Sequence, residues 1–292
     1  MPGKLDEKTR RKILSFQRNE ITEHIIYGKL AQASRNPHNR KLLEGFSQDE
    51  LAHYGFWKKH TGQEVKPSGL KIWKYFLIAR IFGLTFGLKL MERGEEGAQE
   101  AYHKVGRAIP ESQKVMKDEE MHERKLLDMI DEQKLRYVGS IVLGLNDALV
   151  ELTGTLAGLT FAFQNSAIVS LAGLITGIAA SFSMGASEYL STKSESGGKN
   201  PLKASVYTTL AYILTVFFLI SPYFIFANPF LALGVTVMNA VIVIFVFTFY
   251  VSVAKDLPFR KRFSEMVAIS LGVAGLTFVI GMLVRIFLGI EI

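Results

Sequence analysis

The chain contains no cysteine. This absence excludes disulfides, thiolate zinc sites and cysteine-ligated iron, so any bound metal must be held by oxygen and imidazole ligands. The chain also lacks an apolar segment at its amino terminus, because residues 1–18 are polar. A secretory signal needs such a segment, and we therefore expect the first half of the protein to remain in the cytosol.

Long apolar runs are scarce in the first half of the chain and frequent in the second. Runs such as Tyr207–Ala227 reach the ~20 residues that a membrane-spanning helix needs. The sequence therefore predicts an all-α protein with two domains. Residues 1–133 would form a cytosolic helical bundle, and residues 134–292 a five-span transmembrane domain.

Stacking aromatic residues are not interleaved with the basic residues, although the formal net charge is +7. Much of this excess charge lies in short segments beside the apolar runs, not on a surface suited to a nucleic-acid strand. We therefore expect no nucleic-acid partner.

Five spans are predicted, and the connections between them alternate in charge. Basic residues gather in two connections, whereas the turns around Asn165 and Asn228 carry no Lys or Arg. The positive-inside rule then predicts a multi-pass protein with residues 1–133 in the cytoplasm and the carboxyl terminus outside. The absence of a targeting segment favours the cell (plasma) membrane. The spans are 137–163, 167–191, 204–227, 230–254 and 264–289, and the basic residues are Lys193, Lys199, Lys203, Lys255, Arg260, Lys261 and Arg262.

Acidic residues stand inside the first two spans. Asp147 and Glu151 are four residues apart and share one helix face. An ionised acid in mid-membrane costs roughly 2.5–3.5 kcal/mol, so the pair implies a partner, a proton or a cation, unless Asp147 is solvated at the membrane surface. Met184 and Glu188 are also four residues apart. A thioether beside a carboxylate could coordinate a transition metal, although a methionine in a membrane helix also serves simply in packing.

The segments that hold these residues resemble the vacuolar iron transporter family. They read GLNDALVELTGTLAGL at Gly144–Leu159 and SMGASEYLSTKSE at Ser183–Glu195. The resemblance covers most of residues 135–292. It implies five spans, a homodimer, and exchange of Fe(II) or Mn(II) against protons.

The resemblance also implies that Asp147 and Met184 contact the metal along a path between the first spans of two subunits. We add Glu151, Glu188 and Glu195 to this path because of their charge and the helix faces on which they lie. Plant members of the family carry an acidic, helical metal-binding insert between the second and third spans, but the segment here is only KSESGGKNPLK. Metal capture would therefore be done elsewhere in the chain, or not at all.

The first half of the chain reads as four helices separated by breaker residues. Carboxylates and histidines recur on them, and two Glu-x-x-His pairs each project from one helix face. A Glu from each of two helices plus Glu-x-x-His from each of the other two is the ligand pattern of ferritin-like di-iron or di-manganese bundles. The helices are 6–33, 39–60, 70–105 and 111–133, and the candidate metal ligands are Glu20, Glu50, His53, Glu92, Glu95, Glu96, Glu119 and His122.

This pattern is similar to the rubrerythrin branch of the ferritin-like superfamily over about residues 10–132. The resemblance implies a di-iron centre with Tyr27 beside the metals and Glu95 as an extra carboxylate. Either Glu95 or Glu96 could face the metals, because spacings of three and four residues from Glu92 are both acceptable. Rubrerythrins that act as peroxidases commonly carry a cysteine-ligated iron domain, so a peroxidase role in this chain would need an external reductant.

The segment Ile72–Met91 is apolar, but Lys74, Arg80 and Lys89 interrupt it. We favour a buried helix of the bundle or of a dimer, with a helix lying on the membrane surface as the alternative. A sixth span would separate the ligands of the fourth helix from the others, so the metal pattern argues against it.

Together these patterns predict a homodimeric transporter that exports Fe(II) or Mn(II) from the cytosol by proton antiport, with an iron-binding bundle that captures or senses metal. The alternative is a membrane-anchored di-iron ferroxidase or peroxidase. A third reading is a membrane protein that binds metal without moving it. No catalytic residue is assigned.

Overall fold

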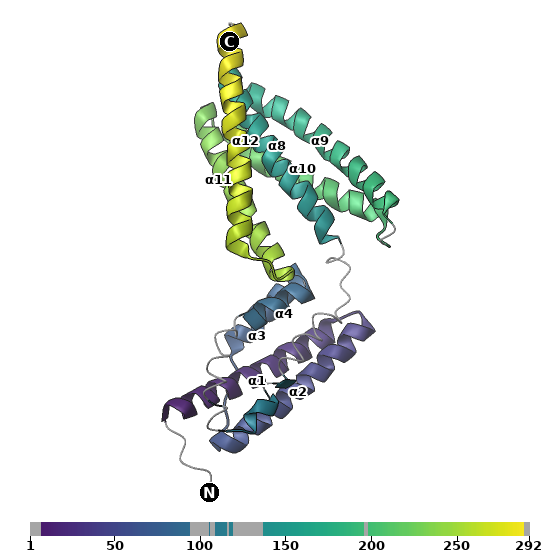
Figure 1. Ribbon diagram of the computed structural model, residues 1–292, viewed down its shortest axis with the longest axis vertical. Coiled ribbons are helices and arrows are strands. Elements are labelled where there is room, and N and C mark those ends of the chain that lie inside the picture. Colours follow the sequence, from purple (N-terminus) through teal and green to yellow (C-terminus); the bar gives the residue numbers. More distant parts are fainter. Residues whose placement is uncertain are drawn as a thin grey trace. The chain divides into compact units, whose positions relative to one another are not determined.

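The computed structural model describes residues 7–93, 105, 109–115, 117–118, 137–195 and 198–288. Over these ranges the secondary structure is helical, with no strand, as the sequence predicts. The chain divides into two compact units, Met1–Glu132 and Gln133–Ile292, which are described separately (Figure 1).

The first unit contains a long helical pair. Helices α1 and α2 lie side by side along their length (Figure 1). Asn36 caps α2, because its side chain accepts hydrogen bonds from the backbone N–H groups of His38 and Asn39, and Pro37 takes the first helical position. Gly62 ends α2 in the left-handed conformation, at φ 64°. The helices of this unit are α1 (Glu7–Ala33), α2 (Pro37–Thr61), α3 (Gly69–Phe82) and α4 (Leu84–Arg93).

The expected continuous helix 70–105 is wrong at Gly83. This residue has φ 108° and ψ 152°, a backbone conformation that glycine adopts far more readily than other residues, and it separates α3 from α4. A Cβ placed on Gly87 would lie 2.5 Å from the Cβ of Ala79, so the absence of a side chain lets α4 fold closely against α3. Neither helix approaches the ~20 residues of a membrane span.

Apolar residues from all four helices form the main core of the first unit. Ile26 and Leu30 of α1 pack with Leu43 of α2, Ile72 of α3 and Leu88 of α4, all of them buried. For the expected fourth helix, residues 112–115 and 117–118 are helical and the remainder lies outside the described residues. The ferritin-like four-helix bundle therefore stays a prediction.

Among its described residues, the second unit contains five helices that are long and apolar enough to cross a membrane, as many as the spans that the sequence predicts. Asparagine caps three of them, at Asn165, Asn200 and Asn228, and the last two are followed by proline at the first helical position. Five apolar helices indicate a multi-pass membrane protein. The helices are α8 (Val138–Phe163), α9 (Ser166–Ser194), α10 (Pro201–Ile225), α11 (Pro229–Ala254) and α12 (Phe259–Leu288).

Small residues bring α8 and α12 into close contact. A Cβ on Gly281 of α12 would lie 2.2 Å from the backbone oxygen of Gly158 on α8. The hydroxyl of Thr277 donates a hydrogen bond of 2.6 Å to the backbone oxygen of Gly154, one turn away. Close backbone approach through small residues is how helices associate in lipid, where apolar side chains gain little from leaving the solvent.

Replacing Gly281 by alanine should lower the thermal stability of the detergent-solubilised protein. The added methyl group meets backbone, which cannot rotate away, and such overpacking costs about 1–3 kcal/mol. Gly275→Ala on the same helix is the matched control, because its Cβ meets nothing within 4 Å. Equal melting temperatures for the two variants would contradict this packing.

Candidate functional site

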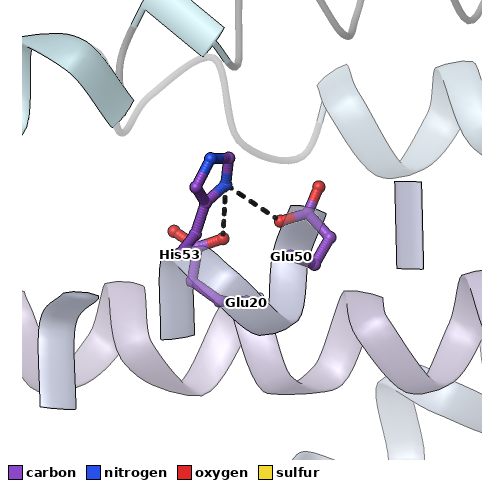
Figure 2. Close-up of side chains that lie close together, drawn as sticks. All are labelled: Glu20, Glu50 and His53. Carbon is purple, nitrogen blue, oxygen red and sulfur yellow. Dashed lines mark ion pairs between the residues drawn. The ribbon is translucent and has the colours of Figure 1, made fainter. Parts of the chain in front are cut away.

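Three side chains converge inside the first unit. Glu20 comes from α1, while Glu50 and His53 come from α2, three residues apart and therefore on one helix face (Figure 2). One ligand atom from each residue lies within 4.8 Å of the others, and all three residues are buried. Among the described residues, this is the only group of three or more such side chains with that geometry.

One nitrogen of the histidine ring faces both carboxylates. Its Nδ1 is 3.7 Å from Glu20 Oε2 and 3.6 Å from Glu50 Oε2 (Figure 2). Two carboxylates and one imidazole form a donor set of hard oxygens and nitrogen, which suits iron, manganese or zinc. The group could therefore bind a metal ion.

Trp57 holds the other oxygen of Glu20. Its indole Nε1–H donates a hydrogen bond of 2.9 Å to Glu20 Oε1, and its side chain is fully buried. The ring packs against Phe16 and Phe56. One carboxylate oxygen of Glu20 is thus fixed by a neutral donor, and the other faces His53.

Sequence analysis missed Trp57. A signal was present, because Trp57 follows His53 by four residues and therefore lies on the face of α2 that carries the two ligands. A bulky side chain on that face would be expected to pack around the site.

The remaining candidate ligands of the first unit lie outside the described parts. Glu92 belongs to α4, but its side chain is not among those described. Glu95, Glu96, Glu119 and His122 lie outside the described residues altogether. Tyr27, expected beside the metals, is buried on α1, where its ring lies 5.9 Å from that of Phe46 between centroids.

Glu188 is buried in the membrane unit and links α9 to α8. Its Oε1 accepts a hydrogen bond of 2.5 Å from the hydroxyl of Ser140 on α8 and a longer one, 3.4 Å, from Thr192 on α9. The backbone oxygen of Ser140 in turn accepts from the hydroxyl of Thr208 on α10, at 3.0 Å. Sequence analysis did not identify either hydroxyl donor to Glu188.

The other residues of the expected transport path differ in their exposure. Asp147 is partly exposed and Glu151 is exposed, and Glu151 Oε2 accepts a hydrogen bond of 2.9 Å from the hydroxyl of Tyr212. Met184 is partly buried against the apolar cluster of α8, α10 and α11. Glu195 is exposed at the carboxyl end of α9.

The comparisons with known proteins bear on the membrane unit. No curated protein matches the chain. A family model described as the VIT family matches residues 138–197, which comprise α8, α9 and the start of the connection to α10. Residues 138–197 thus carry a VIT family domain with helices of membrane-spanning length, and this segment holds Asp147, Glu151, Met184 and Glu188.

Proposed function

We propose that this protein is a proton-coupled exporter of Fe(II), with Mn(II) as the alternative substrate. The observation that carries the proposal is the VIT family match over the two helices that bear the intramembrane acids. A helix that served only as an anchor would have no use for Asp147, Glu151 and Glu188, because each acid raises the cost of insertion.

Within the described residues of a single chain, the three acids of the proposed path, Asp147, Glu151 and Glu188, do not form a group like that of Glu20, Glu50 and His53. We therefore propose that two copies of α8 face each other in a homodimer, and that the path is completed by both. Asp147 and Met184 would contact the metal ion as it moves along the path, and Glu151 and Glu188 would line the same path. A carboxylate that releases a cation can take up a proton in its place, which couples the two movements.

The first unit would capture or sense the metal before export. Its buried Glu20, Glu50 and His53 supply hard donors, and the candidate ligands beyond the described residues would complete a di-iron centre. Metal held there supplies a Lewis acid or, with iron, a redox-active ion. The basic connections Lys199–Lys203 and Lys255–Arg262 favour a cytoplasmic location for this unit.

Iron flux into proteoliposomes under an imposed pH gradient tests the transporter directly. We expect flux in the wild type and its loss in Asp147→Asn, because the amide cannot exchange a proton for the metal. Glu265→Gln on α12, outside the matched residues, is the control and should retain flux. Absence of flux in every protein, with iron still bound and oxidised, would instead favour a membrane-anchored di-iron enzyme.

Glu188→Gln separates the charge of Glu188 from its structural contact. The amide oxygen can still accept the hydrogen bond from Ser140, so the melting temperature should stay near that of the wild type. Flux should fall strongly, because the side chain can no longer carry or release a proton. Undiminished flux would show that Glu188 serves only to connect the helices.

Metal binding by the first unit can be followed through Trp57. The chain has two tryptophans, so Trp73→Phe leaves Trp57 as the only one. Anaerobic Fe(II) should quench its fluorescence, since its indole hydrogen-bonds to Glu20. Glu50→Gln in this background should weaken binding by at least about tenfold, given that even outer-shell changes cost 10–100-fold.

The control for this titration is Glu44→Gln, an exposed acid on the same helix. It should bind Fe(II) like the wild type. Identical titrations for Glu44→Gln and Glu50→Gln would contradict the proposed metal site.

A further inference from the structure

Helix α3 is apolar on two opposite faces. One face carries Ile72, Tyr75 and Ala79, which are buried in the core of the first unit. The opposite face carries large apolar side chains that are 49–84% exposed. They are Leu70, Trp73, Leu77 and Ile81, spaced by three or four residues and therefore aligned in one stripe.

This stripe is distinct from the rest of the described part of the first unit. Apart from the α3 residues, Leu51 is the only large hydrophobic side chain exposed there. Scattered single exposures are normal on a protein surface, but a continuous apolar stripe marks an interaction site.

Basic residues flank the stripe, and α3 contains no acidic residue. At 3.6 residues per turn, Arg80 falls on one side of the stripe and Lys74 on the other. The ammonium group of Lys29, on α1, lies 5.0 Å from the centre of the Trp73 ring and adds a third cation. Apolar residues between basic flanks, with tryptophan among them, are typical of helices that lie in the membrane interface.

From this surface we infer that α3 lies on the bilayer which the same chain crosses, with its stripe in the acyl boundary and Lys74 and Arg80 at anionic headgroups. The first unit is linked to a bilayer through the chain itself, because the described residues include five helices of spanning length. A symmetric pairing of α3 with its copy is disfavoured, since it would oppose like charges without an acid to balance them. Lipid phosphates supply the missing negative charge.

This contact would hold the metal-binding group close to the membrane surface. The buried face of α3 packs with α1 and α2 residues in one core, and α1 and α2 carry Glu20, Glu50 and His53. The inference does not depend on whether the membrane unit transports iron.

Trp73 is the probe for this contact. It is 56% exposed, whereas Trp57 is fully buried, so the difference between the wild type and Trp73→Phe isolates the signal of Trp73. The experiment uses the full chain in nanodiscs that contain anionic lipids brominated near the headgroup. We expect these lipids to quench Trp73 strongly and aqueous iodide to quench it weakly.

Leu77→Asp/Ile81→Asp tests the stripe without touching the core, because both positions are exposed. The variant should lose roughly half or more of the lipid quenching of Trp73, since charged residues no longer enter the acyl boundary. Leu51→Asp, an exposed leucine on α2, is the matched control and should retain it. The same two substitutions in the Trp73→Phe background should leave the emission spectrum of Trp57 unchanged, which shows that the unit remains folded.

Two results would overturn the inference. Strong quenching by iodide without quenching by lipid would place the stripe in water. Protection from both quenchers would mean that protein covers it, from either a second copy or another segment of this chain.

Discussion

A carboxylate that leaves water must receive hydrogen-bond donors or a cation, and both units of this protein are organised by that requirement. Trp57 donates to Glu20, Ser140 and Thr192 donate to Glu188, and Tyr212 donates to Glu151. These donors are neutral. They satisfy individual oxygen atoms without supplying a positive charge.

The same requirement explains why these acids sit on helices that pack closely. Glu188 reaches Ser140 only because α8 and α9 lie against each other, and Ser140 is in turn bonded by Thr208 of α10. Near the carboxyl end of α8, Gly158 permits the close approach of α12. The helix that carries Asp147 and Glu151 is thus held on several sides, while these acids remain accessible to different degrees.

Much of the architecture could be predicted from the sequence, because span length and apolar content depend only on local composition. Five helices of spanning length lie where the sequence predicts spans, but some of them begin earlier than predicted. Asn200-Pro201 begins α10 ahead of the expected position 204, since asparagine caps the helix and proline fits its first turn. The break at Gly83 was missed because apolar residues continue on both sides, and a single glycine is tolerated inside many helices.

Partners across helices were harder to predict. The sequence could group Glu20, Glu50 and His53, which the structure brings together, because the expected ferritin-like ligand pattern relates residues on different helices. Ser140 lies 48 residues from Glu188, and no sequence pattern relates these two residues. Which serine faces an acid depends on the rotation and register of packed helices, and sequence spacing within one helix does not specify either. For the same reason, the sequence of α3 does not show which of its two apolar faces is buried. The structure shows that the stripe is the exposed face and that the opposite face packs in the core.

The central claim is that acids in the membrane unit exchange metal for protons. Its most direct test follows both ions at once, in anaerobic proteoliposomes that contain a pH-sensitive dye and start without a pH gradient. Addition of Fe(II) outside should cause metal to enter and the internal pH to rise in step, as protons leave in exchange. Binding of Fe(II) with neither entry nor a change of internal pH would contradict the account.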